Sequence, residues 1–271
     1  MMTETFVSFR IKQPVQTQIL TNRFLMKTWH DYFKRNRDNR PNIPWKKGLQ
    51  VEAFLRRPLI RSLQRFQLGE SGNGRHLMKG AQKTGDKNYV QAMELFIKEE
   101  QEHARWLGEI LQRLDAPPLT RHWSNLAFTG LRRLLGLREE LFVLLVAEMI
   151  AKRYYHTLRE GTNDPVLKMV FGQMWQDEMG HVAFHTDFLQ RVFSSWSLPI
   201  RVIVRALWRA LYRVVCLVVM LDHRALIRAA GDSLPAFWWD CELTFDEVAA
   251  SIFSFSQRPF PIGNMPSAKP N

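Results

Sequence analysis

Two four-residue segments, Glu100-Gln-Glu-His103 and Glu178-Met-Gly-His181, share the pattern Glu-x-x-His. A lone glutamate stands 30 positions before each, Glu70 before the first and Glu148 before the second. Every member of the second set lies 78 positions after its counterpart in the first. The same offset relates two further pairs, Asp86 with Asp164 and Leu111 with Leu189. This regular offset indicates an internal duplication of a helix pair.

The spacing within each pair suits a helix that faces a core. Residues three apart lie on nearly the same helix face, so Glu-x-x-His can aim a carboxylate and an imidazole at one point. Large residues flank both pairs at steps of three and four, as expected of a buried stripe. These residues are Met93, Phe96, Leu107, Ile110 and Leu114, and then Leu167, Phe171, Met174, His185, Phe188 and Val192. The stripes of the upstream glutamates contain Leu59, Leu63, Phe66, Leu77 and Ala81, and Leu141, Leu145 and Tyr155.

Four carboxylates and two imidazoles would therefore converge inside an apolar core. Each buried charge would cost several kcal/mol unless an opposite charge compensated it. Two divalent cations would supply the compensating charge. Oxygen and nitrogen ligands without thiolates suit iron or manganese. One glutamate from each of two helices plus Glu-x-x-His from two others is the di-iron carboxylate arrangement. We predict two iron ions, with manganese or a mixed pair as alternatives, held by Glu70, Glu100, His103, Glu148, Glu178 and His181.

These motifs also resemble a known superfamily. Gly69-Glu70-Ser71-x-x-x-Arg75, followed by Glu100-x-x-His103-Ala104, resembles the first half of rubrerythrin and its ferritin-like relatives. Asp177-Glu178-x-x-His181 resembles the last ligand helix of the larger di-iron oxidases and oxygenases. The resemblance covers roughly residues 56–196 and implies that the six residues are iron ligands, with Glu100 and either Glu178 or Glu148 as bridges. Unlike rubrerythrin, the chain has no four-cysteine rubredoxin domain and carries long extensions on both sides.

Other residues near the motifs are candidates for supporting roles, and no catalytic side chain beyond the metals is predicted. Asp177 and Glu99 each precede a ligand glutamate and could accept a hydrogen bond from an imidazole on a neighbouring helix. His185, one turn beyond His181, is an additional ligand, a residue that supports the ligands from behind, or a core histidine. Tyr155, two turns beyond Glu148, either reaches the site or fills the core.

The sequence predicts an all-α protein built on a ferritin-like four-helix bundle with a long crossover and helical extensions. The predicted division is an N-terminal extension (1–55), the di-iron bundle (56–196), a basic, aromatic C-terminal extension (197–258) and a disordered tail (259–271). Asp164 is a plausible N-cap. Helices are expected near 15–35, 58–85, 87–114, 138–160, 165–193, 198–230 and 236–255, with a short one near 126–135.

The helix expected from residue 198 carries a cationic stripe. Arg201, Arg205, Arg209 and Arg213 are spaced by four, which leaves only Val214–Leu221 as an uninterrupted apolar run. A membrane span needs about 20 apolar residues. Two alternatives remain: a helix at a membrane interface, with arginines near lipid phosphates, or a helix packed on the bundle with its arginines in water.

The composition bears on where the protein is located and on which partners it binds. The net charge is +12, which attracts nucleic acid, anionic lipid or acidic partners, although a basic solvated surface explains it equally well. We expect no nucleic-acid partner. The two cysteines, Cys216 and Cys241, exclude a disulfide scaffold and an iron–sulfur cluster. The first residues lack the pattern of a signal peptide, so we expect a cytoplasmic protein, with peripheral membrane contact through residues 198–221 as the alternative.

The leading functional hypothesis is a di-iron oxidase or oxygenase that activates O₂ or peroxide. It would oxidise or hydroxylate an organic substrate, either a small molecule or a lipid-like one. Because no reductase motif is visible, an external electron donor is implied. A second hypothesis is iron handling, as a ferroxidase, or peroxide scavenging without an organic substrate. A third is a helical interaction module that has lost catalysis.

Overall fold

A computed structural model describes residues 28–123, 130 and 137–253 of the 271-residue chain. Within these ranges every regular element is a helix, which confirms the all-α class. The elements are α1 (Trp29–Asp38), a short 3₁₀ helix η3 (Trp45–Lys47), α2 (Ala53–Glu70), α3 (Arg75–Gln82), α4 (Lys87–Arg113), α6 (Leu137–Gly161), α7 (Pro165–Phe193), α8 (Leu198–Ala229) and α9 (Leu234–Phe253). The helices predicted near 87–114, 138–160 and 165–193 are confirmed to within a residue or two.

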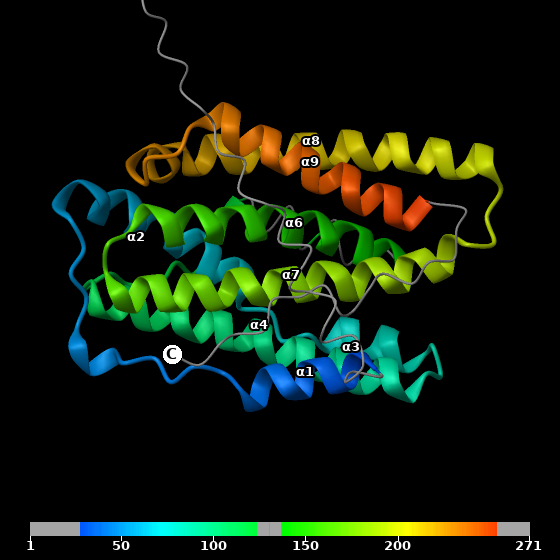
Figure 1. Ribbon diagram of the computed structural model, residues 1–271, viewed down its shortest axis with the longest axis horizontal. Coiled ribbons are helices and arrows are strands. Elements are labelled where there is room, and N and C mark those ends of the chain that lie inside the picture. The colour runs from blue at the N-terminus through cyan, green and yellow to red at the C-terminus, as the bar shows by residue number, and fades with distance from the viewer. Residues whose placement is uncertain (1–27, 124–129, 131–136, 254–271) are drawn as a thin grey trace, which may run out of the picture.

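Four long helices, α2, α4, α6 and α7, occupy the middle of the molecule (Figure 1). α2 packs against α4, and α6 packs against α7. α8 and α9 cover one side, where α8 contacts α2 and α6 and α9 contacts α7. α1 lies on the opposite side against α4. The four helices that carry the predicted ligands are therefore flanked on two sides by the extensions.

The duplication has a structural counterpart at the starts of α4 and α7. The Asp86 carboxylate accepts a hydrogen bond from the Tyr89 amide at 3.1 Å, and Asp164 does the same for Leu167 at 2.8 Å. Both aspartates are N-caps, which satisfy amide groups that a helix start leaves unpaired. The N-cap predicted at Asp164 is confirmed, and its counterpart at Asp86 sets the matching start of the other helix.

The predicted core stripes are buried. Most of their apolar residues are almost fully removed from solvent, while Phe66, Phe188 and Val192 are half-buried against the core. The buried members are Leu59, Leu63, Leu77, Ala81, Met93, Phe96, Leu107, Ile110, Leu114, Leu141, Leu145, Tyr155, Leu167, Phe171 and Met174. Hydrophobic periodicity therefore identified the inward faces correctly.

The first of the four long helices differs from the prediction. A single helix was expected over 58–85, but the chain forms α2 and α3, separated after Glu70. Gly74 has a left-handed φ of 63°, and a Cβ there would overlap the Ile97 side chain of α4. Only glycine tolerates both conditions. At the other end, burial of Leu55 extends α2 ahead of Pro58, where the helix was expected to begin.

The N-terminal helix is shifted relative to its prediction. A helix was expected over about 15–35, ending before Arg37, whereas α1 begins after its N-cap Thr28 and continues through Asp38. Residues 1–27 lie outside the described part of the chain, as do the short helix predicted near 126–135 and the tail 259–271. The division at residues 55 and 196 stays a prediction.

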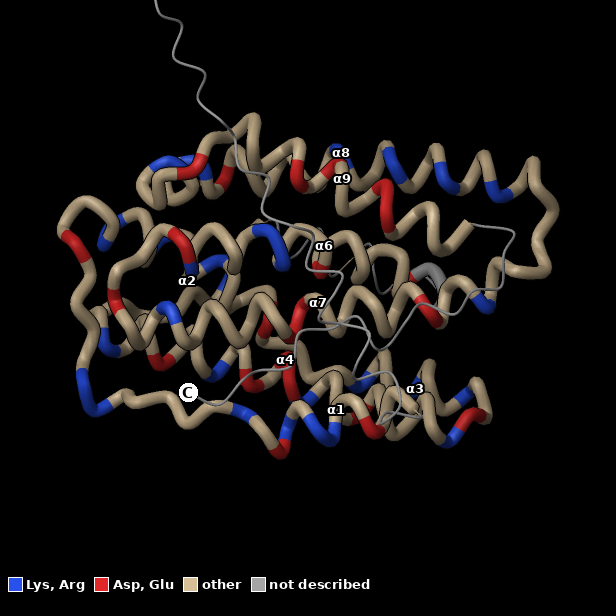
Figure 2. The backbone as a smooth tube through the Cα atoms, viewed as in Figure 1, with Lys and Arg blue, Asp and Glu red and all other residues tan. Residues whose placement is uncertain are grey.

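The arginines of the α8 stripe all have protein partners, although three of them stay partly exposed. Arg201 is buried and donates to the Trp196 carbonyl at 2.9 Å. Arg205 and Arg209 pair with Asp246 of α9, and Arg213 pairs with Glu242 at 2.7 Å. Figure 2 shows the basic positions repeating along α8 beside acidic positions on α9. The alternative of a helix packed on the bundle is therefore confirmed, except that acids 29 to 41 positions later pair with three of its arginines. Contact with a membrane stays a prediction.

None of the helices in the described ranges combines the length and apolar character needed to cross a bilayer.

Candidate metal centre

All six predicted ligands meet at one place between the long helices. Glu70 is the last residue of α2, Glu148 comes from α6, and the two Glu-x-x-His pairs come from α4 and α7. Their ligand atoms form two groups, each within 4.8 Å. One group contains Glu100, Glu148, Glu178 and His181, and the other contains Glu70, Glu100 and His103. Glu100 belongs to both groups.

The two imidazoles point their Nδ1 atoms at the shared carboxylates. His181 Nδ1 lies 3.1 Å from Glu100 Oε1 and 3.4 Å from Glu178 Oε2. His103 Nδ1 lies 3.6 Å from Glu100 Oε1 and 3.5 Å from Glu178 Oε1. Glu178 therefore faces one imidazole with each oxygen, whereas Glu148 lies 3.4 Å from His181 Nδ1. This geometry favours Glu178 over Glu148 as the partner of Glu100 between the two groups.

Several of these atoms lack the partner that a buried polar atom needs. Glu100 Oε1, Glu178 Oε2, His103 Nδ1 and His181 Nδ1 have no hydrogen-bond partner among the described residues. Such buried atoms are rare and costly unless an ion or water satisfies them. Nitrogen and oxygen ligands about 2.1 Å from one ion lie roughly 3 Å from each other in octahedral geometry. The spacings of 3.1 to 3.6 Å fit shared cations.

The cluster is buried on one side and open on the other. His103 and His181 are fully buried, and Glu148 and Glu178 are at most 3% exposed. Glu70 and Glu100 are only partly buried. Glu70 ends α2, next to the exposed Gly72 and Asn73 of the α2–α3 break. The break that sequence periodicity did not predict therefore lies at the open edge of the cluster.

Crowding of the carboxylates shifts their protonation. Burial, followed by repulsion from Glu100, raises the pKa of Glu70 well above its usual value. Burial and repulsion from Glu148 do the same for Glu178, and they raise the pKa of Glu100. For Glu148, burial is outweighed by the neighbouring Glu178 carboxyl group and His181 imidazole, which lower its pKa to about 2. Four carboxylates cannot all ionise this close together without added positive charge.

The pKa of His181 shifts upwards, opposite to the direction in which burial alone would shift it. Burial would lower the pKa of His181, but the surrounding carboxylates of Glu100, Glu148, Glu178 and Glu99 outweigh it and raise the pKa well above its usual value. A cation at Nδ1 would replace that proton. Because histidine ligates as the neutral base, proton loss accompanies metal binding at such a site.

The residues that precede the ligand glutamates hold the far side of each imidazole. His103 Nε2 lies 3.0 Å from Asp177 Oδ2, and His181 Nε2 lies 3.1 Å from Glu99 Oε2. Each histidine therefore pairs with the carboxylate of the opposite repeat, as predicted for Asp177 and Glu99. An Nε2–H that donates to a carboxylate leaves the Nδ1 lone pair directed at the cluster.

Asn36 of α1 and Arg40, two residues after its end, complete this outer layer and were missed by the sequence analysis. Asn36 Nδ2 donates to Glu99 Oε1 at 2.7 Å and to Asp177 Oδ1 at 2.8 Å. Arg40 donates to Asp177 Oδ2 at 2.7 Å and lies 3.5 Å from Glu99 Oε1. Gln173 of α7 also donates to Asp177 Oδ1 at 2.8 Å. No sequence pattern connects α1 with the duplicated motifs, because its partners are 63 to 141 positions away.

Tyr155 and His185 differ in their relation to the cluster. The Tyr155 hydroxyl donates to Glu70 Oε1 at 2.8 Å, so Tyr155 reaches a predicted ligand. His185 is fully buried beside Phe96 and Phe184, and both of its ring nitrogens lack a hydrogen-bond partner in the described residues. Burial lowers the pKa of His185 to about 3, so the ring is neutral. His185 belongs to neither ligand group.

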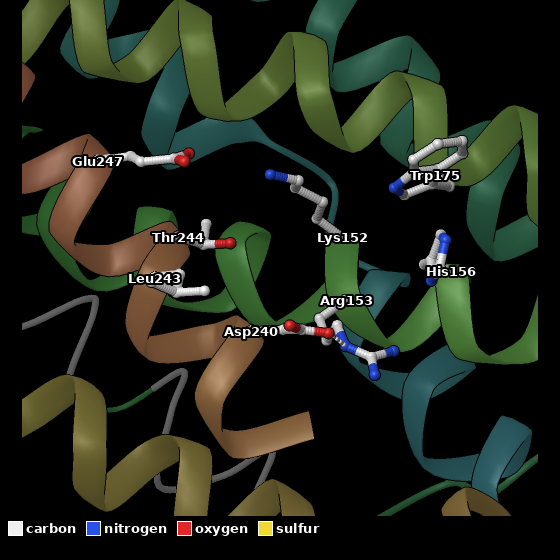
Figure 3. Close-up of a pocket in the computed structure, with 8 residues that line it drawn as sticks. All are labelled: Lys152, Arg153, His156, Trp175, Asp240, Leu243, Thr244 and Glu247. Carbon is white, nitrogen blue, oxygen red and sulfur yellow. Dashed lines mark ion pairs between the residues drawn. The ribbon is translucent and has the colours of Figure 1, made fainter. Parts of the chain in front are cut away.

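A surface pocket of about 280 Å³ lies where α6, α7 and α9 meet (Figure 3). Lys152 extends into it between Glu247 and Trp175, and Arg153 pairs with Asp240 at 2.8 Å. None of the predicted ligands lines this pocket. The lining residues are Lys152, Arg153, His156, Trp175, Asp240, Leu243, Thr244 and Glu247.

Comparison with protein-family models, with curated proteins and with solved structures gave no match. The chain is helical throughout its described elements and brings a buried group of glutamates and histidines within metal-binding distance.

Proposed function

We propose that the chain is a ferritin-like di-iron carboxylate oxidoreductase that activates O₂ or peroxide to oxidise or hydroxylate an organic substrate. The observation that carries the proposal is the set of four buried ligand atoms without a hydrogen-bond partner in the described part of the chain, contributed by Glu100, Glu178, His103 and His181. Oxygen and nitrogen ligands without sulfur favour iron or manganese over softer metals.

The proposed assignment gives each ion one histidine and one terminal glutamate. His103 and Glu70 would hold one ion, and His181 and Glu148 the other. Glu100 and Glu178 would bridge, since both carboxylates face both imidazoles. Two divalent ions would balance four carboxylates, which accounts for so many acids at one buried site.

A bound ferrous pair would supply electrons for the reduction of O₂ or peroxide. The protein's own residues would hold that pair and limit the access of water. Phe33 and Phe96 pack against His181, with ring centroids 6.1 and 4.7 Å away. The partly exposed side of Glu70 and Glu100, at the α2–α3 break, would admit small reactants. An external donor would return the electrons used in each turnover.

The reaction with oxygen tests this proposal. Protein loaded anaerobically with Fe²⁺ should consume O₂ and change its absorption spectrum at a rate that exceeds the oxidation of free Fe²⁺. A Glu178→Ala variant should lose that enhancement, whereas Glu102→Ala, at an outward position of the other motif, on α4, should keep it. Oxidation no faster than that of free Fe²⁺ would contradict the proposal.

A lipid-like substrate, reached by peripheral contact with a membrane, is part of the proposal. α8 presents an exposed apolar face opposite the face that packs on the molecule. The exposed members are Ile200, Ile203, Leu207, Val214, Leu217 and Leu221, which are 46% to 67% exposed and spaced by three, four or seven. Exposed Arg224 and Arg228 follow at its end. Contiguous apolar surface of this kind marks interaction sites, and a helix lying in a membrane interface buries such a face.

Vesicle binding tests the membrane contact separately from the metal centre. The wild-type protein should sediment with vesicles that contain anionic phospholipid, and a Leu207→Glu/Leu217→Glu variant should remain in the supernatant. Phe54→Glu is the matched control, because Phe54 is 66% exposed on α2, away from this face. Failure of the wild type to sediment at low salt would reject membrane contact and leave the metal proposal intact.

A further inference from the structure

Glu99 and Asp177 are equivalent residues of the two repeats and meet outside the metal cluster. They are 78 positions apart, like the ligands that follow them. Each accepts a hydrogen bond from the histidine of the other repeat. The orientation of both imidazoles therefore depends on where these two carboxylates point.

A single amide group spans the two carboxylates. The NH₂ group of Asn36 has two hydrogens, and the distances of 2.7 Å to Glu99 and 2.8 Å to Asp177 use one for each. A carboxylate that is fixed through one oxygen presents its other oxygen in a defined direction. The oxygens that Asn36 leaves available, Glu99 Oε2 and Asp177 Oδ2, are those that face His181 and His103.

Arg40 supplies the positive charge that this pair of acids requires. Its guanidinium is 2.7 Å from Asp177 and 3.5 Å from Glu99 and lies over the Trp106 ring at 5.2 Å. The side chain is only 14% exposed, and the Asp177 and Glu99 side chains are 0% and 5% exposed. Charge pairs this deeply buried hold their geometry because alternative partners in water are excluded.

α1 docks directly on the second Glu-x-x-His motif. A Cβ at Gly180, inside Glu178-Met-Gly-His181, would collide with the Tyr32 ring, so glycine makes room for α1. Phe33 is fully buried between Phe96 and Phe184, and Trp29 donates to Asp187 of α7 at 2.9 Å. These contacts place Asn36 on a packed helix, and Arg40 follows two residues after the end of that helix.

We propose that Asn36 and Arg40 are positioning residues of the metal centre, so that α1 and the residues just after it, outside the duplicated helices, set the direction of both ligand histidines. The inference rests on the proposed function, because it assumes that the histidines bind metal. It extends that function because it gives the N-terminal helix a role in positioning the ligand histidines. Loss of either residue should weaken binding at both ions together, since each residue contacts both Glu99 and Asp177.

Co²⁺ binding to the full-length protein tests the inference, because the visible spectrum of Co²⁺ reports ligand geometry as well as occupancy. Asn36→Leu and Arg40→Met should weaken Co²⁺ binding by roughly 10- to 100-fold, the range found when partners of metal-binding histidines are removed. They should also shift the Co²⁺ absorption bands. Arg40→Lys keeps the charge and should recover part of the loss.

Arg37→Met is the matched control, because Arg37 lies on the same helix with a 54% exposed side chain and pairs with Asp38. It should bind Co²⁺ as the wild type does. Asn36→Leu retains Arg40 and the charge balance, so it decides the question even if Arg40→Met does not fold. A folded Asn36→Leu protein with unchanged Co²⁺ affinity and an unchanged Co²⁺ spectrum would overturn this inference but not the proposed function. A wild type that binds no metal would overturn the proposed function itself.

Discussion

At the scale of single residues, several of the predicted ligands stay protonated to higher pH than usual, and a bound metal must displace these protons. Burial raises the pKa of Glu70, Glu100 and Glu178, so these carboxyl groups keep protons above their usual titration range near pH 4.5. His181 also holds its proton to higher pH than usual. Glu148, with a pKa of about 2, is already ionised and releases none.

Metal uptake should therefore release protons, and apparent affinity should rise with pH. The raised pKa values mean that more protons must leave at lower pH, so binding weakens as the pH falls from neutral towards the usual carboxyl pKa. Calorimetry of Co²⁺ binding in two buffers of different ionisation enthalpy measures the release near neutral pH. Equal heats in both buffers, together with a pH-independent affinity, would contradict this prediction.

Tyr155 should tune the ion held by Glu70. In Tyr155→Phe the hydrogen bond to Glu70 Oε1 is lost, and metal affinity should fall by roughly 10-fold while the fold is retained. Tyr154→Phe is the control, since the neighbouring Tyr154 hydroxyl bonds to Ser62 instead, at 2.6 Å. Competition titrations with a chelator compare the two, and an equal loss in both variants would remove Tyr155 from the site.

His185 should prove dispensable for metal binding. Its two unpaired nitrogens are buried, and each unsatisfied buried polar group costs about 1–3 kcal/mol. His185→Leu should therefore raise the melting temperature of the apo protein and leave the metal content unchanged. If the variant loses metal instead, His185 is a ligand, and the assignment of six ligands is incomplete.

At the scale of elements, the helix pairs were predictable and their surroundings were not. The repeat at Glu100 and Glu178 fixed the inward faces of α4 and α7, because three-residue spacing and apolar periodicity are local properties. The break after Glu70 had a local signal in Ser71-Gly-Asn-Gly74, but Leu77 and Ala81 continue the apolar stripe beyond it. Periodicity therefore outweighed the glycine signal, and the two helices were predicted as one.

The docking of α1 should depend on Gly180. In Gly180→Ala the new methyl group overlaps the Tyr32 ring, so α1 must move, even though alanine favours a helix by about 1 kcal/mol over glycine. We expect faster hydrogen exchange in α1 and weaker Co²⁺ binding. Gly172→Ala is the control on the same helix, since its nearest side-chain atoms are 3.5 Å away. Unchanged hydrogen exchange in α1 after Gly180→Ala would mean that the docking of α1 does not depend on the contact between Gly180 and Tyr32.

At the scale of the whole molecule, the extensions contribute through contacts between residues far apart in sequence. Asn36 and Arg40 reach Asp177 across 141 and 137 positions, and the α8 arginines are matched by acids of α9. No periodicity or motif encodes such pairings, because they depend on how separate helices pack. The candidate ligands were predictable because the duplication repeats the same three ligand positions, 78 residues apart.

The iron content of the protein tests the central claim most directly. After anaerobic loading with Fe²⁺ and removal of unbound metal, the wild type should retain two iron ions per chain. Glu100→Ala should lose most of both, because Glu100 belongs to both ligand groups. Glu102→Ala, two positions away and paired with Arg105, should retain two. A wild type that retains no iron, or a Glu100→Ala variant that retains two ions, would contradict the account.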